Sequence, residues 1–306
     1  MAANQQELDL NKIKEYGNIE MLAKQMVEGF ITGLHKSPYH GFSVEFAEHR
    51  LYNEGDSTRY IDWKVYAKTD RLYTKRFEEE TNLRCMILLD KSSSMYYPVE
   101  NHGKMRFSLM AAACISYMLQ RQRDAVGLCS FAEEVDLFTP VKSTSAHIHN
   151  LFLFLQQMLE EPPKQARTSV AEVIHSVAKR LHKRSLVIIF SDMMENTENH
   201  DEIFSALQHL KHNHHEILIF HTYDQRTELD FQFPERPIIF VDVETGQQEK
   251  AQPSQIRNMY QKKIKERFQE IKLTCGQYKI DFIEADIAKS MDQIMLPYLI
   301  KRKRMK

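Results

Sequence analysis

Apolar and polar residues follow two spacings along this chain, one typical of helices and one typical of strands. Near the N-terminus, apolar side chains recur at helical spacing and form one stripe, which predicts a helix over Ile19–Leu34. This helix should end before Pro38, because proline disfavours helix in the residue that precedes it. From residue 41 to residue 77, short alternating segments rich in aromatic residues predict a small β-rich subdomain.

From residue 84 onward, short apolar runs typical of buried strands take turns with longer stretches of helical periodicity. The predicted strands are Cys85–Leu89, Ala125–Phe131, Val135–Thr139, Leu186–Phe190, Ile217–Thr222 and Tyr278–Ile283. The predicted helices are Lys104–Arg123, Ser145–Leu159, Thr168–Leu181, His200–His212, Ile256–Gly276 and Met291–Arg302. This alternation predicts an α/β fold, in which a mainly parallel sheet carries helices on both faces. Right-handed crossovers would then align the carboxyl ends of the strands along one edge.

These patterns divide the chain into three parts. Residues 1–83 hold the N-terminal helix and the β-rich subdomain, residues 84–300 hold the α/β domain, and residues 301–306 form a basic tail. A basic run at a chain end is typical of a solvated terminus. The alternative is a weak contact with an acidic partner or with an anionic membrane surface.

Composition narrows the functional classes. The chain has 306 residues, of which 42% are hydrophobic, so it can form one large or two ordinary domains with a real core. A formal net charge of −1 does not favour binding to nucleic acid. No apolar stretch approaches the roughly 18–20 residues of a membrane span, and the first residues lack the basic and apolar regions of a signal peptide.

The cysteines indicate a cellular compartment. Cys85, Cys114, Cys129 and Cys275 lie within predicted strands or helices, and none forms a Cys-x-x-Cys pair. Such residues are typical of buried free thiols in a reducing environment. We therefore predict a cytoplasmic protein.

The residues that could bind a ligand directly follow the predicted strand Cys85–Leu89. Asp90-Lys91-Ser92-Ser93-Ser94 places one carboxylate and two hydroxyls at a strand end, where open α/β sheets bind ligands. One carboxylate with neutral oxygens suits a hard divalent cation that keeps several waters, such as Mg²⁺. Taken alone, the same motif also fits a serine-rich cap of the next helix.

Two further loops share this edge if the strands are parallel. Thr168 lies at the start of a predicted helix, and Asp192 follows the predicted strand Leu186–Phe190. Each of these residues alone is also typical of a helix cap. All three loops together predict a metal site with the ligands Asp90, Ser92, Ser94, Thr168 and Asp192. Because few of these ligands are carboxylates, the cation would remain electrophilic toward an acidic group of another molecule.

Two other clusters allow more than one interpretation. Arg59, near Asp62 and Trp63, fits an ion pair that pins the subdomain or a surface for a partner, and core packing is the expected role of Trp63. A polar turn is favoured over zinc binding for the cluster His209, His212, His214, His215 and Glu216. The sequence contains no phosphate-binding loop, dinucleotide fingerprint or hydrolase motif.

These residues carry a family likeness. Asp90, Ser92, Ser94, Thr168 and Asp192 resemble the metal-ion-dependent adhesion site of von Willebrand factor type A domains. The segment Gly41–Trp63 resembles the signature of the bacterial domain-of-unknown-function 58 proteins, with its Glu-Phe, Arg-x-Tyr, Gly-Asp and Arg-x-Ile-Asp-Trp elements. Residues 76–80, 221–224 and 241–246 are similar to other segments of that family.

The resemblance implies a Rossmann-like von Willebrand factor type A domain with a bound Mg²⁺, or another divalent cation such as Mn²⁺ or Ca²⁺. It also implies a partnership with MoxR-type AAA+ ATPases, which are thought to act as chaperones or in the maturation of other protein complexes.

Three functional hypotheses follow. The leading one is a non-catalytic interaction module, in which the cation binds an acidic side chain of a partner protein, an AAA+ ATPase or its client. The second is a Mg²⁺-dependent phosphatase or phosphotransferase with Asp90 as the nucleophile. Such phosphatases usually carry a second aspartate two residues on, where this chain has Ser92. The third is a purely structural role.

Overall fold

The chain forms two compact units, one of residues 1–31 and 83–306 and the other of residues 32–82. The computed structural model describes residues 18–34, 46–53, 58, 61–77, 83–99, 103–161, 170–181, 184–193 and 200–304. The predicted ligand Thr168 lies outside these residues, as do Gly55, Asp56 and Arg59 of the signature segment. The expected boundary at residue 83 is one edge of the smaller unit, whereas most of the N-terminal helix groups with the larger unit.

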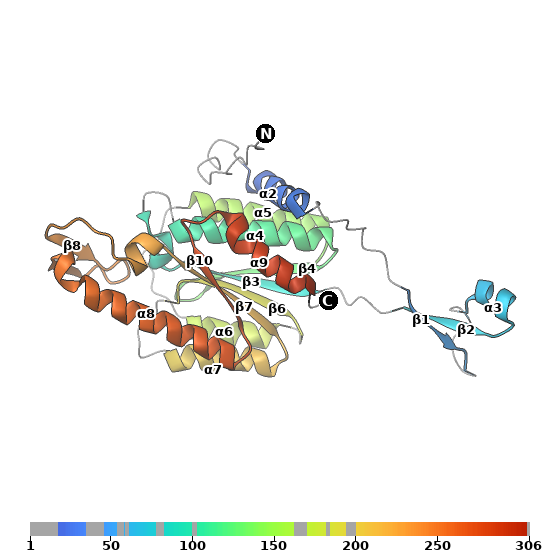
Figure 1. Cartoon of the computed structure of the whole chain (residues 1–306). Helices are drawn as coiled ribbons and strands as arrows, with labels where there is room; N and C mark the ends of the chain where they lie inside the picture. Colours follow the sequence, from blue (N-terminus) through green and yellow to red (C-terminus); the bar gives the residue numbers. More distant parts are fainter. Residues whose placement is uncertain are drawn as a thin grey trace, which may run out of the picture. The chain divides into compact units, whose positions relative to one another are not determined.

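A six-stranded sheet with the order β10-β7-β6-β3-β4-β5 forms the centre of the larger unit (Figure 1). The strands are β3 (Arg84–Asp90), β4 (Ala125–Phe131), β5 (Val135–Phe138), β6 (Leu186–Ser191), β7 (Glu216–Tyr223) and β10 (Asp281–Asp286). Among the described residues, each neighbouring pair is parallel except β4 and β5, which are antiparallel. The predicted mainly parallel sheet is therefore confirmed.

Helices cover both faces of this sheet (Figure 1). On one side lie α4 (Gly103–Arg121), α5 (Ser145–Glu160) and α9 (Met291–Arg304), and on the other lie α6 (Val170–Arg180), α7 (His200–His212) and α8 (Pro253–Gln277). Because both faces of the sheet are covered, the side chains on both faces of strand β3 are buried. Cys85, Ile87 and Leu89 belong to the core on the α4 side, while Met86 and Leu88 belong to the core on the α6 side. A strand covered on both faces reads as a continuous apolar run, as predicted.

The N-terminal helix α2 (Ile19–Leu34) packs into the core of the larger unit. Ile19, Leu22 and Ala23 are buried there, and the backbone N–H of Ile19 donates to the Gln156 side chain at 3.0 Å. Asn18 begins the helix by accepting a hydrogen bond from the backbone N–H of Glu20 at 2.8 Å. Between residues 19 and 27, the apolar stripe in the sequence is therefore the face that α2 buries.

The smaller unit contains an antiparallel pair of strands, β1 (Phe46–Leu51) and β2 (Tyr73–Phe77), and the short helix α3 (Trp63–Thr69). Asp62 caps α3 by accepting hydrogen bonds from the backbone N–H groups of Lys64 and Val65. Trp63 is exposed, which contradicts its expected role in a core. The reason is local, because α3 is only two turns long and none of its residues is buried.

Two regions of the larger unit differ from the prediction. Strand β10 begins at Asp281 rather than Tyr278, because α8 continues to Gln277 and Lys279 turns the chain with a φ of 54°. Residues 225–251 also form elements that were not predicted. These are a single π-helical turn, η6 (Gln225–Leu229), and a hairpin of β8 (Ile238–Val241) and β9 (Gln248–Ala251). None of the helices in the described part combines the length and apolar character needed to cross a membrane.

Gly103 provides a test of the packing at the start of α4. A Cβ atom here would come within 3.0 Å of the Tyr97 carbonyl oxygen and of the Pro98 ring. We expect Gly103→Ala to lower the free energy of unfolding by about 1–3 kcal/mol, because backbone would have to move. As a control, Gly276→Ala in α8 meets nothing within 4 Å and should raise stability by about 0.5–1 kcal/mol. Urea denaturation of both variants measures the difference, and equal effects would contradict the crowding at Gly103.

Candidate functional site

The carboxylate of Asp90 is fixed at the end of the central strand β3. Its oxygens accept hydrogen bonds from the Ser92 backbone N–H at 2.9 Å and from the Ser191 hydroxyl at 2.7 Å. Strands β3 and β6 are parallel and pair Leu89 with Phe190, so the next residues, Asp90 and Ser191, meet at the same edge. The Asp90 side chain is almost fully buried, with 1% of the residue exposed.

The two hydroxyls of the motif lie next to each other. The Oγ atoms of Ser92 and Ser94 are 3.1 Å apart; Ser92 directly precedes the 3-10 helix η3 (Ser93–Tyr96), and Ser94 lies within it. Mg²⁺–oxygen bonds of about 2.1 Å place neighbouring ligands of an octahedron about 3 Å apart. The spacing of the two hydroxyls therefore fits adjacent ligands of one Mg²⁺.

Asp192 is held by a lysine that the sequence did not single out. The Nζ of Lys104 donates to Asp192 Oδ2 at 2.7 Å and to Glu228 Oε1 at 2.5 Å. Lys104 comes from the first turn of α4, Asp192 follows β6, and Glu228 lies in η6. The lysine side chain has 0% exposed surface, so these two carboxylates replace water around its ammonium group.

Electrostatics keep Lys104 charged. Burial alone would lower the pKa of Lys104, but the nearby Asp192 and Glu228 carboxylates outweigh it and raise that pKa above its usual value. Burial raises the pKa of Glu228, and the Lys104 ammonium opposes that effect. The backbone N–H of Asp224 also donates to Glu228 at 2.7 Å, which fixes the second carboxylate oxygen.

Asp90 is a further carboxyl group in the same buried region. Burial, together with repulsion from Asp192, raises the pKa of Asp90 to about 7. The Lys104 ammonium contacts Asp192 and Glu228, so these two carboxylates carry one negative charge more than their partner, and an ionised Asp90 beside Asp192 adds another. A divalent cation would balance the remaining negative charge, so the donor set around Asp90 fits a Mg²⁺ site.

The loop that carries Asp192 is positioned from both sides. His221 Nε2 lies 2.9 Å from the Asp192 carbonyl oxygen, and it must be the donor because a carbonyl only accepts. Burial lowers the pKa of His221 to about 4, so this ring is neutral near pH 7. Met193 follows with a φ of 51°, which is uncommon for a residue with a side chain. Its N–H donates to the Ser191 hydroxyl at 3.0 Å, and its carbonyl accepts from Arg267 at 3.2 Å.

The predicted ligands therefore divide into three groups. Asp90, Ser92 and Ser94 come together at the end of β3, and Asp192 lies at the same edge but binds Lys104 through one oxygen. Thr168 lies outside the described residues. Ser191, Lys104 and Glu228 also belong to this site but were not in the predicted ligand set. Lys104 left a weak signal in the sequence, because a lysine in the first turn of a helix interacts unfavourably with the helix dipole.

The predicted histidine cluster does not converge on one point. The Ser185 backbone N–H donates to Nδ1 of the buried His215 at 3.1 Å. His212 and His214 are exposed, whereas Nδ1 of His209 contacts Nδ1 of His175 in α6 at 3.3 Å. The polar turn that the sequence favoured lies between α7 and β7, and His209 contacts a residue of α6 rather than the other histidines of the predicted cluster.

The buried charge cluster leads to a stability prediction. Replacing Lys104 with Met keeps the side-chain length but leaves Asp192 and Glu228 buried without a cation. We expect Lys104→Met to lower the free energy of unfolding by about 3–5 kcal/mol. In the double variant Lys104→Met/Glu228→Gln the loss should be smaller, because one buried carboxylate is removed. Guanidinium denaturation in metal-free buffer measures both, and an unchanged stability of Lys104→Met would contradict the ion-pair geometry.

Comparison with known proteins gives relatives without an assigned role. The chain is 24% identical over 176 residues to the uncharacterized protein Rv1480 of Mycobacterium tuberculosis and to the uncharacterized protein Mb1516 of Mycobacterium bovis. Each alignment covers 58% of this chain and 55% of the relative. The chain thus spans about half the length of the curated relatives that it matches.

Two solved structures are similar at a low level. The conserved hypothetical protein BatB from Bacteroides thetaiotaomicron is 13% identical with a TM-score of 0.42, over 73% of this chain and 100% of that one. An aerotolerance-related membrane protein from Bacteroides fragilis is 12% identical with a TM-score of 0.42, over 70% of this chain and 98% of that one. Values this low support no statement about a shared function.

A family model matches a larger part of the chain than these relatives do. The model of the family described as "Protein of unknown function DUF58" matches residues 48–270, which include β3, the Asp90 motif, Lys104, Asp192 and Glu228. This match covers most of the chain, and the chain belongs to the DUF58 family.

Proposed function

We propose that this protein is a non-catalytic interaction module that binds an acidic side chain of a partner protein through a Mg²⁺ ion at the end of β3. The observation that carries the proposal is the arrangement of Asp90, Ser92 and Ser94. A buried carboxylate lies beside two hydroxyls that are 3.1 Å apart, at the edge where open α/β sheets bind ligands. Mn²⁺ or Ca²⁺ could replace Mg²⁺, because both prefer oxygen ligands.

The charges around the site support binding of an acidic group. The Lys104 ammonium balances one of the two charges of Asp192 and Glu228, so this pair and Asp90 together supply negative charge for the ion. When bound, Mg²⁺ would supply a positive centre with ligand positions still open to water or to a partner carboxylate. Asp90, Ser92 and Ser94 would hold it, with Thr168 and one oxygen of Asp192 as the remaining predicted ligands.

The resemblance to the adhesion site of von Willebrand factor type A domains points in the same direction. It suggests a MoxR-type AAA+ ATPase, or a client of one, as the partner, and assembly or maturation of other proteins as the process. The four cysteines are buried free thiols, which supports a reducing, cytoplasmic setting for this work.

The phosphatase hypothesis receives no specific support from the geometry. Phosphatases that use an aspartate nucleophile usually carry a second aspartate two residues on, and this chain has Ser92 there. The Ser92 backbone N–H donates to Asp90, and its hydroxyl lies beside that of Ser94. Hydrolysis of p-nitrophenyl phosphate that disappears in Asp90→Asn would revive this hypothesis.

Binding of Mg²⁺ should raise the thermal stability of the protein. A ligand that binds only the folded state stabilises it by about 2.7 kcal/mol at a concentration of 100 times Kd. We expect MgCl₂ to raise the Tm of the wild type, and Asp90→Asn and Ser94→Ala to reduce this increment. Glu249→Gln, in the exposed strand β9, is the matched control and should keep the full increment.

Only the Mg²⁺-dependent part of the Tm is informative here. Asp90→Asn removes a buried charge and can change stability by itself, so each variant is compared with and without MgCl₂. An equal increment in wild type and Asp90→Asn would place the ion elsewhere and overturn the proposed ligand set.

Partner binding should require both the ion and Asp90. Affinity capture from extract of the native cells would compare wild type with MgCl₂, wild type with chelator, and Asp90→Ala with MgCl₂. We expect an AAA+ ATPase or its client only in the first sample, because the partner carboxylate needs the cation. Equal capture of that partner in all three samples would contradict a cation-bridged contact and direct attention to residues 41–80.

A further inference from the structure

Two histidines face each other on the outer surface of the larger unit, on the side of the sheet that α6 and α7 cover. Nδ1 of His175 in α6 lies 3.3 Å from Nδ1 of His209 in α7, and the ring centroids are 5.5 Å apart. Both residues are half-buried. The strand-end site at Asp90 uses neither of them.

The contact between the two rings imposes a condition on their protons. A neutral imidazole has one N–H and one lone pair, so one His must carry its proton on Nδ1 to donate to the other. If both rings carry the proton on Nε2 instead, two lone pairs point into the same gap. The gap then offers two nitrogen ligands for one metal ion.

The separation of the two nitrogens matches a particular coordination geometry. Zn²⁺ binds imidazole nitrogen at about 2.0–2.1 Å, and tetrahedral angles place two such nitrogens about 3.3–3.4 Å apart. The observed distance is 3.3 Å. We propose that His175 and His209 form a binding site for Zn²⁺ that joins α6 to α7.

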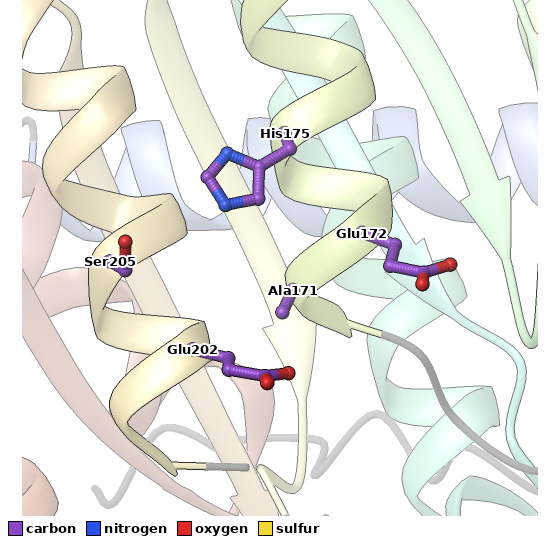
Figure 2. Close-up of a pocket in the computed structure, with 5 residues that line it drawn as sticks. All are labelled: Ala171, Glu172, His175, Glu202 and Ser205. Atoms are coloured by element: carbon purple, nitrogen blue, oxygen red, sulfur yellow. The ribbon is translucent and has the colours of Figure 1, made fainter.

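A carboxylate that could serve as an oxygen ligand lines the same pocket as His175. A pocket of about 350 Å³ opens between the two helices and is lined by Ala171, Glu172, His175, Glu202 and Ser205. Figure 2 shows His175 and Glu202 extending into the space between α6 and α7, whereas Glu172 points to the other side of α6. Glu202 is exposed, so its carboxylate can change rotamer without disturbing the core.

The two histidines alone do not form a complete metal site, so binding of Zn²⁺ would have to recruit the remaining ligands. Among the described residues, no three His, Cys, Asp or Glu side chains already converge on one point. The two imidazoles supply two positions, and water or a carboxylate that moves toward them, such as that of Glu202, completes the tetrahedral set. Nitrogen ligands also distinguish this site from the oxygen site at Asp90, since imidazole favours Zn²⁺ and Mg²⁺ prefers oxygen.

Titration calorimetry with ZnCl₂ tests this assignment on the full chain without a histidine tag. Wild type should bind one Zn²⁺ at this site. Loss of a residue that only supports a metal ligand lowers metal affinity by about 10- to 100-fold. His175→Gln and His209→Gln each remove a ligand itself, so each should lower the Zn²⁺ affinity by at least as much. Glu202→Gln should weaken it less, because water can replace the carboxylate. Zn²⁺ should also raise the Tm of wild type and not that of the two histidine variants.

A matched control separates this site from histidines elsewhere. His149→Gln removes an exposed imidazole on α5, on the other side of the sheet, and should bind Zn²⁺ like wild type. Circular dichroism would show that the histidine variants remain folded, which both half-buried positions should allow. Unchanged Zn²⁺ affinity in His175→Gln and His209→Gln, or no stoichiometric binding to wild type, would leave the pair as a hydrogen bond between helices and overturn the proposal.

Discussion

Lys104 places an ammonium group inside the protein, next to the ends of the central strands. A charge without contact to water is stable only when carboxylates take the place of that water. Asp192 after β6 and Glu228 in η6 do so, and both contact the same nitrogen atom. Because α8 holds the residues after η6 through a hydrogen bond from Gln261 to the Asp230 carbonyl at 2.7 Å, this one cluster connects α4, the sheet edge and α8.

The pairing of the strands brings Asp90 next to this charge cluster. Parallel pairing of β3 with β6 places Asp90 beside Ser191, one residue before Asp192. The two aspartates then influence each other, and burial together with this repulsion raises the pKa of Asp90 to about 7. A region that is short of positive charge, and that has hydroxyls at the spacing of metal ligands, is suited to a cation. The same desolvation that disfavours the charged form of the Asp90 carboxylate would strengthen its interaction with a cation.

Sequence periodicity was most successful where burial is complete. The run Cys85–Leu89 predicted a central strand because helices cover both of its faces, and the alternation of strands with helices predicted the parallel sheet. It was least successful over residues 225–251, where η6 and the β8–β9 hairpin are short and partly exposed. Phe240 of β8 stacks on Phe231, which in turn contacts Tyr260 of α8, and these contacts join residues that are far apart in the sequence.

The sequence by itself determined the α/β class and the Asp90-x-Ser92-x-Ser94 turn, because both depend on local patterns of a few residues. Only the tertiary structure decided which charged and polar side chains contact each other. Lys104 meets Asp192 across 88 residues and Glu228 across 124, and His209 meets His175 rather than its neighbours in the sequence. Such pairings depend on strand order and helix packing. No local pattern encodes them, because the partners come together only when the sheet and both helix layers are assembled.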